Sequence, residues 1–298
     1  MWYCVPSINE KVAQFLITAR ERTVAEGDML LRCLEPLRQH WIKEFNGIEV
    51  TLKTSNGEAI NGVHFPGTQK KAILFLHGNG CFYETSAERP LSWVRDLSTE
   101  GGSPHLLIFN PRGTGKSEGI THPKTVAEDF LIAFRYLVAH SVDPNHIIIA
   151  GHSMGGFFGA FGAALIQNAF PTNTIHCLSD RSFSNIYDRV DVKIQNCFQR
   201  AMMHCLIKLS QWDCSPMIAL GTLKGRVCII FHQQDEVIPY PTSLHASIKQ
   251  CSRSYSYLEL RGGLSPAHNG ECCEAEYKQM LVEMKKMLGL TLEPHLPS

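Results

Sequence analysis

The sequence predicts an α/β protein in which a mainly parallel, eight-stranded sheet is covered by helices on both faces. Apolar runs of strand length recur along the 298 residues, and most are almost continuously apolar, as strands buried on both faces are. Amphipathic helical patterns separate these runs, and strands that alternate with helices form mainly parallel sheets. A third observation is the motif G-x-S-x-G at 151–155, which stands where a strand pattern gives way to a helical one.

The chain begins with a helical pattern that runs from about residue 8 to residue 45. We therefore predict an N-terminal helical arm at 1–46 and a second unit at 47–298. This unit opens with two alternating segments, "GIEVTLKT" and "EAINGVHF", joined through Asn56 and Gly57. Asn-Gly between alternating segments is a strong signal for a tight turn, so we expect an antiparallel hairpin that leads into the sheet.

The parallel part of the sheet follows from the apolar runs. Six strands are expected, at 71–77, 105–110, 146–151, 175–180, 226–232 and 254–260. Apolar residues at helical spacing predict one helix around Phe130, with Pro123 near its start, and another around Leu281.

The segment at about 183–225 contains no strand pattern. One helical face there carries Phe198, Met202, Leu206 and Leu209. We expect this insertion to form a small cap over the carboxyl edge of the sheet. The alternative is a helix that simply packs on the sheet.

Charge and hydropathy exclude several classes of partner. Lysine plus arginine and aspartate plus glutamate both number 28, so the formal net charge is zero. This balance gives no electrostatic reason to expect nucleic acid or an anionic membrane as a partner. The stretch 147–166 has the length of a membrane span, but it turns at Gly-His-Ser-Met-Gly-Gly, which is typical of a buried strand followed by a buried helix. We expect no integral membrane segment.

The cysteines do not predict a disulfide framework. There are 11 of them, an odd number, scattered and without a C-x-x-C pair, which favours a reducing compartment. His176-Cys177 and His204-Cys205 are single pairs without partners at the spacing of zinc ligands. The sequence predicts neither a metal nor a cofactor.

Ser153 is the candidate nucleophile. In Gly151-His152-Ser153-Met154-Gly155, the strand-to-helix junction forces a sharp turn that pushes the serine hydroxyl into the open. The glycines are needed because the turn brings backbone segments too close for a Cβ, and Ser153 is expected at positive φ. A serine hydroxyl is a poor nucleophile without a base, and the base needs an orienting carboxylate.

Asp235 and His268 are the candidates for that carboxylate and that base. Asp235 lies just after the strand expected at 226–232, and His268 lies in the Gly/Pro-rich loop after 254–260. Because the carboxyl ends of parallel strands meet at one edge of a sheet, we expect both on the same rim as Ser153. The alternatives are Asp180 and Asp213 as acids and His232 and His245 as bases, with His77 and His152 as structural neighbours of the site.

A tetrahedral intermediate also needs donors for its oxyanion. The backbone N–H after the nucleophile, that of Met154, is the first candidate. The second is expected in the loop after the first parallel strand, at Asn79, with Gly80 as the alternative.

The segment "NPRGTGKSEG" at 110–119 contains Gly-Thr-Gly-Lys-Ser, which looks like the end of a phosphate-binding loop. That loop requires a glycine five positions before Gly115, where Asn110 stands, and Pro111 removes a backbone N–H from the cradle. We therefore do not predict a nucleotide site, and we expect Lys116 to lie in solvent.

Four separated motifs together resemble the α/β-hydrolase superfamily: HGNG at 77–80, RGTGKS at 112–117, GHSMGG at 151–156, and Asp235 followed by His268. The resemblance covers about 47–290 and implies the α/β-hydrolase fold with Ser153, Asp235 and His268 as a catalytic triad. "HGNG", "RGTGKSEG", "SDRSFSNI" and "AHNGE" look like segments of the Bem46-like branch, although Asp180-Arg181-Ser182-Phe183 replaces its Glu-Asn-Thr-Phe. The N-terminal arm looks like those of Legionella effector lipases.

These features predict a serine hydrolase that cleaves a carboxylic ester or thioester of a small molecule or a lipid. The alternative is a catalytically silent scaffold that binds a ligand or a protein partner. Phe198, Met202 and Met203 would suit an acyl chain if they faced the site, and would otherwise be core residues. The chain is expected in the cytoplasm, or exported without a secretory signal peptide, as the likeness to effectors would imply.

Overall fold

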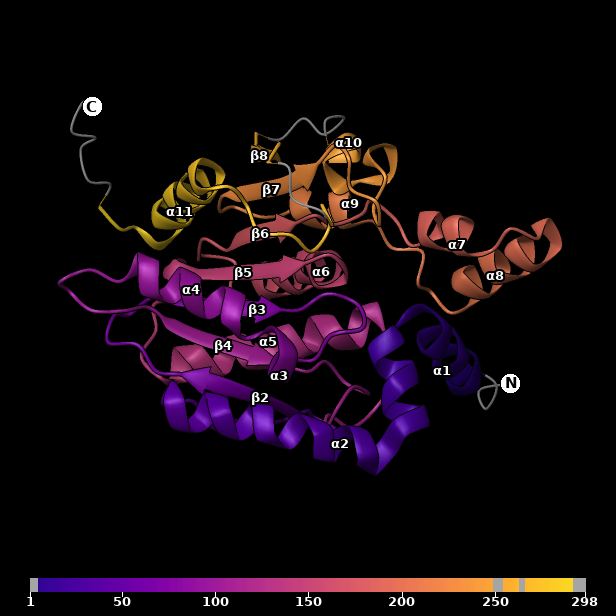
Figure 1. The fold of residues 1–298 in the computed structure, drawn as a ribbon, viewed down its shortest axis with the longest axis horizontal. Coiled ribbons are helices and arrows are strands. Elements are labelled where there is room, and N and C mark those ends of the chain that lie inside the picture. Colours follow the sequence, from indigo (N-terminus) through magenta and orange to yellow (C-terminus); the bar gives the residue numbers. More distant parts are fainter. Residues whose placement is uncertain (1–4, 249–253, 263–265, 292–298) are drawn as a thin grey trace.

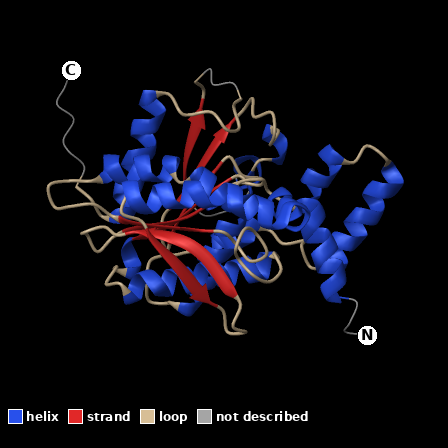
Figure 2. Cartoon of the chain, turned by 60° about the horizontal axis from the view of Figure 1, so that its bottom comes forward, coloured by secondary structure: helices blue, strands red, loops and turns tan. Residues whose placement is uncertain are grey.

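The computed structural model describes residues 5–248, 254–262 and 266–291. The first four residues of the predicted arm and the last seven of the predicted second unit lie outside the described residues. Strands in the centre of the molecule are flanked by helices on both sides (Figure 2).

The described residues form one eight-stranded sheet with the order β1-β2-β4-β3-β5-β6-β7-β8. Its strands are β1 Ile48–Lys53, β2 Ala59–Phe65, β3 Ala72–Leu76, β4 His105–Phe109, β5 Ile147–His152, β6 His176–Asp180, β7 Val227–His232 and β8 Ser256–Leu260. The first two strands form the predicted hairpin, β2 pairs antiparallel with β4, and all later pairs are parallel. The predicted mainly parallel sheet is therefore confirmed.

Two apolar cores lie on the two faces of the sheet, because neighbouring strand residues point to opposite sides. Leu74 and Leu76 join the core beneath α5 Pro123–Ala139 and α6 Met154–Ala169, whereas Ile73 and Phe75 join the core beneath α4 Glu88–Leu97 and α11 Glu274–Leu288. Figure 1 shows these helix pairs on opposite sides of the strands. Both cores need strands that are apolar on both faces, which is why the apolar runs are continuous.

The arm predicted at the N-terminus consists of α1 Val5–Leu16 and α2 Thr18–Glu44. The two helices are separated at Ile17, whose backbone is extended, and α2 is kinked at Gly27, where φ is +50°. Figure 1 shows α2 running alongside β2 at one edge of the molecule. Arg38 and Trp41 of α2 are buried against the rest of the fold.

The insertion at 183–225 forms α7 Tyr187–Lys193, α8 Cys197–Leu209 and α9 Pro216–Gly221. Figure 1 shows α7 and α8 extending away from the strands. The predicted helix exists, but Phe198 is 76% exposed, and Met202 and Leu209 are exposed as well. Phe198 and Met202 are therefore not core residues, whereas Met203 is partly buried and packs against the core beneath α5 and α6. The remaining short helices are α3 Tyr83–Ser86 and α10 Leu244–Ile248, with 3-10 turns at Pro144–His146 and Tyr240–Thr242.

Candidate active site

Ser153 lies at the sharp turn between β5 and α6. Its φ is +53° and its ψ is −118°, the strained conformation that the motif predicted. A Cβ on Gly155 would come within 2.1 Å of the carbonyl oxygen of Leu76, and one on Gly151 within 2.3 Å of the Gly155 backbone. Glycine at both positions therefore lets helix α6 start directly on top of the strands.

Asp235 follows β7 in a tight turn whose backbone N–H groups donate hydrogen bonds to its carboxylate. Oδ1 accepts hydrogen bonds from the N–H of Val237 at 2.8 Å and of Ile238 at 2.7 Å. Burial by itself would raise the pKa of Asp235, but the hydrogen bond from His268 and these two N–H groups hold that pKa below its ordinary value. The carboxylate is therefore charged and fixed in direction.

His268 lies in the turn between β8 and α11 and connects the other two side chains. Its Nδ1 is 2.8 Å from Oδ2 of Asp235, and its Nε2 is 2.9 Å from the hydroxyl oxygen of Ser153. Ser153 and Asp235 are each 6% exposed and His268 is 4% exposed. The structure thus brings the three predicted side chains together as a nucleophile, a base and an orienting acid would be arranged.

The two predicted oxyanion donors lie in segments that meet at Ser153, the start of α6 and the loop after β3. Met154 is the first residue of α6, where backbone N–H groups lack helical partners. Gly78 lies against the nucleophile, since a Cβ there would be 3.3 Å from the Cβ of Ser153. Within the described part of the chain, the N–H groups of Asn79 and Met154 donate no hydrogen bond.

The side chain of Asn79 serves another purpose. It accepts a hydrogen bond from the N–H of Thr18 at 2.7 Å and donates one to the carbonyl of Leu16 at 2.9 Å. The extended residue Ile17 separates α1 from α2 at this point. The break in the arm is therefore tied to the loop that carries the expected donor, a contact that no motif predicted.

Asp180 and His245, an alternative acid and an alternative base, have other partners. Asp180 is ion-paired with Arg181, and His152 donates to Asp180 over 3.0 Å. Burial lowers the pKa of His152 to about 4, so this imidazole is neutral at pH 7 although it lies 5.0 Å from the ring of His268. His245 stacks on Phe231.

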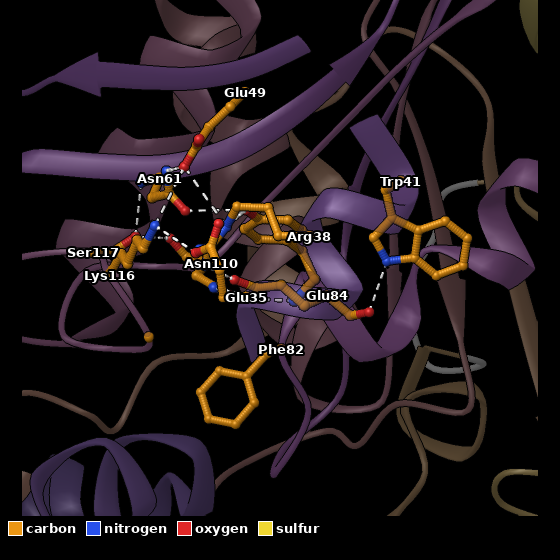
Figure 3. A network of polar contacts seen from close by, with 12 residues as sticks. Glu35, Arg38, Trp41, Glu49, Asn61, Phe82, Glu84, Asn110, Lys116 and Ser117 are labelled. Carbon is orange, nitrogen blue, oxygen red and sulfur yellow. Dashed lines mark hydrogen bonds and ion pairs between the residues drawn. The ribbon is translucent and has the colours of Figure 1, made fainter. Parts of the chain in front are cut away.

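The loop at 110–119 is tied to the N-terminal arm (Figure 3). Asn110 donates to Glu84 over 3.0 Å, and Glu84 forms a buried ion pair with Arg38 of α2. The other side of the Asn110 amide accepts from His77 at 3.1 Å. Lys116 is exposed, as expected, and it forms a surface ion pair with Glu35 of α2 at 3.1 Å.

A cavity of about 1010 Å³ opens between α4 and α11. Phe75, Trp93 and Met280 contribute apolar lining. At its other end the cavity reaches His152 and Asn269, which adjoin Ser153 and His268 in sequence, and Gly78, which adjoins Asn79. It is thus adjacent to the candidate site.

Two general features of the described residues bear on cofactors and membranes. They contain no group of three or more His, Cys, Asp or Glu side chains placed to hold a metal ion. None of the described helices combines the length and the apolar character that a membrane crossing requires.

Comparisons with known proteins agree with this architecture. Residues 73–189 match the Alpha/beta hydrolase family. A segment of 133 residues is 35% identical to part of a multifunctional-autoprocessing repeats-in-toxin from Vibrio vulnificus. The match covers 41% of this chain and 2% of that toxin. A similar toxin from Vibrio cholerae is 33% identical over 133 residues.

Solved structures extend the likeness over most of the chain. An alpha-beta hydrolase from Vibrio vulnificus has a TM-score of 0.62 at 22% identity, covering 85% of this chain and 86% of its own. The esterase Pf2001 from Pyrococcus furiosus has a TM-score of 0.57 at 15% identity, covering 82% and 90%. The chain therefore has the α/β-hydrolase fold, as the sequence predicted.

Proposed function

We propose that this chain is a serine hydrolase that cleaves a carboxylic ester or thioester through an acyl-enzyme on Ser153. The observation that carries the proposal is the continuous hydrogen-bonded path from Ser153 through His268 to Asp235, with contacts of 2.9 Å and 2.8 Å. The match to the Alpha/beta hydrolase family and the shared fold with an esterase support it.

In the first half of the proposed reaction, Oγ of Ser153 attacks the carbonyl carbon of the substrate while Nε2 of His268 takes the hydroxyl proton. The negative oxygen that forms accepts hydrogen bonds from the N–H groups of Met154 and Asn79. His268 then passes its proton to the leaving alkoxide or thiolate, and the acyl group remains on Ser153. Asp235 stabilises the charged imidazole throughout.

In the second half, water replaces the serine hydroxyl as the nucleophile. His268 takes a proton from the water, which attacks the acyl carbon. The proton returns to Oγ of Ser153 as the carboxylic acid leaves, so the enzyme is restored with no net change in its protons.

A fluorophosphonate probe tests the proposed nucleophile. Such probes react with an activated serine and should label the wild-type chain covalently. We expect no labelling in Ser153→Ala and strongly reduced labelling in His268→Gln. Normal labelling of Ser153→Ala would refute the proposal. A wild-type chain that is neither labelled nor active on p-nitrophenyl esters of any chain length would favour the silent scaffold instead.

We propose the cytoplasm, or a second cell reached by export without a secretory signal peptide, as the place of action. The similarity to a segment of a repeats-in-toxin protein supports the second location. A translocation reporter fused to the chain would test export. Retention of the fusion inside the producing cell would favour the cytoplasm as the place of action.

A further inference from the structure

The backbone on both sides of His268 is held by one guanidinium group. Nη1 of Arg181 donates to the carbonyl oxygen of Ala267 at 2.9 Å and to that of Gly270 at 2.7 Å. Arg181 is only 2% exposed. One buried side chain therefore brackets the turn from which the imidazole projects.

Asp180 holds that guanidinium from the other side. Its carboxylate accepts from Nε of Arg181 at 2.8 Å and from Nη2 at 2.9 Å, which is the paired geometry that fixes an arginine most firmly. Asp180 also accepts from Arg89 at 3.3 Å, and Arg89 donates to the carbonyl of Asn269 at 2.9 Å. Three backbone carbonyls around His268 are thus bound by two arginines that share one carboxylate.

This cluster is built directly on the strands that carry the other two members of the triad. The N–H of Ser153 donates to the carbonyl of Asp180 at 2.8 Å, and the N–H of Arg181 donates to Ile230 of β7 at 2.7 Å. Arg181 has a φ of +47°, an unfavourable conformation for a residue with a Cβ that persists only where its surroundings enforce it. The rigid sheet is therefore connected to residues 266–273, a described segment that forms no strand or helix.

The charges of the cluster are permanent over the working range of pH. Burial by itself would raise the pKa of Asp180, but the neighbouring Arg181 and its hydrogen bonds keep that pKa well below the ordinary value. His152, which also faces Asp180, is neutral at pH 7 because burial lowers its pKa. The support of the loop therefore does not switch with pH between about 5 and 8.

We propose that Asp180 and Arg181 are positioning residues that fix His268 between Ser153 and Asp235. This inference rests on the proposed function, in which His268 moves the proton. A base on a loop needs such support, because a misplacement of about 1 Å can cost about 100-fold in rate. Neither residue has to touch the substrate for this role, so their loss should lower kcat and leave KM nearly unchanged.

The first test is Arg181→Ala, measured on a p-nitrophenyl ester. We expect kcat to fall about 100-fold while KM changes less than about twofold, as uniform binding is retained. Because Arg181 lines the cavity between α4 and α11, added guanidinium at low millimolar concentration can reach the vacated position and should restore much of kcat. Methylammonium lacks the planar fork and should not.

Arg112→Ala is the matched control. Arg112 is also buried and ion-paired, with Asp129 and Glu128, but among the described residues its hydrogen bonds and ion pairs reach neither of the loops that carry Asp235 and His268. It shows how much activity is lost when a buried, ion-paired arginine away from this cluster is removed.

Arg89→Ala is a second variant for the case that Arg181→Ala does not fold, since Arg89 is partly exposed. We expect a smaller loss of kcat in this variant, about 5-fold to 10-fold.

A measurement independent of turnover separates this inference from the proposed function. The Nδ1 proton of His268, bonded to Asp235, should give a downfield proton NMR signal that is absent in His268→Gln. We expect that signal to broaden or vanish in Arg181→Ala and to persist in Arg112→Ala. An unchanged signal in both Arg181→Ala and Arg89→Ala, or a kcat loss no larger than that of Arg112→Ala, would overturn the inference. If the wild type is not labelled by a fluorophosphonate and cleaves neither esters nor thioesters, the proposed function fails, but the NMR signal still decides the role of Asp180 and Arg181.

Discussion

The side-chain carbonyl of Asn79 accepts a hydrogen bond of 2.7 Å from the backbone N–H of Thr18. This contact joins the start of α2 to the loop that follows β3. Because the backbone N–H of Asn79 is the proposed second oxyanion donor, the N-terminal arm contributes to the support of the reacting centre. The arm and the loop are 61 positions apart in sequence, so the contact depends on the complete fold.

Asn79→Ala should lower kcat by about 5-fold to 30-fold, because it removes two hydrogen bonds worth about 1–2 kcal/mol together while keeping the backbone N–H. Kinetics on a p-nitrophenyl ester would measure this. Asn79→Asp is a second variant, since it keeps the acceptor for Thr18 but turns a charged oxygen toward the carbonyl of Leu16. A loss near 1000-fold would instead indicate that the side chain itself contacts the oxyanion.

Asp235→Asn should lower kcat by about 10⁴-fold, because an amide no longer favours the correct protonated form of the imidazole. The fold should survive, since the amide oxygen can still accept from Val237 and Ile238. Steady-state kinetics together with urea unfolding would separate the two effects. Activity of Asp235→Asn within about tenfold of wild type would mean that another carboxylate, and not Asp235, orients His268.

Asn110→Asp should destabilise the chain by about 3 kcal/mol, because it places a second carboxylate beside the buried Glu84. Asn110 now donates to Glu84 at 3.0 Å, which an aspartate could not do without taking up a proton. Urea unfolding would give the change in the free energy of unfolding.

The control for this prediction is the double variant Asn110→Asp with Glu84→Gln. It exchanges the carboxylate and the amide, so one negative charge remains near Arg38 without a second one beside it, and it should be more stable than Asn110→Asp alone. If Glu84→Gln lowers the free energy of unfolding of Asn110→Asp further, repulsion between the two carboxylates is not the cause of the destabilisation.

Stability should fall as the pH is lowered from about 6.5 to about 4. Burial lowers the pKa of His64, His152 and His176 to about 4 in the folded state, whereas the unfolded chain takes up protons near 6.5. The unfolded state thus binds more protons in this window, and the free energy of unfolding decreases toward acid.

Removing one of these histidines tests the sign and the size of this pH dependence of stability. In His176→Gln, the slope of the free energy of unfolding against pH should decrease by up to about 1.4 kcal/mol per pH unit between pH 4 and 6.5. Urea unfolding at several pH values would measure it. An unchanged slope would mean that His176 titrates alike in the folded and unfolded chains.

The strands could be predicted because each has a local pattern, alternation in the first hairpin and mostly continuous apolar runs in the parallel part, and Gly151 and Gly155 mark the turn at Ser153 within five residues. Asp235 and His268 could be predicted because both follow strands whose carboxyl ends share an edge. The contacts of Arg181 with the loop of His268 could not be predicted, because its partners there are backbone carbonyls, and every residue has one. Apolar spacing likewise predicted a face on α8 but not whether anything covers it, and Phe198 is 76% exposed.

The ion pair of Arg38 with Glu84 affects where the chain can be cut. Both side chains are fully buried, and Trp41 donates to the carbonyl of Glu84 at 2.8 Å. A protease that removed everything before Gly47 would leave the carboxylate of Glu84 inside the protein without its cation, an arrangement that typically costs about 3–5 kcal/mol. The first helices and the sheet are thus bound into a single cooperative unit, and truncation at this boundary would yield a fragment prone to unfolding.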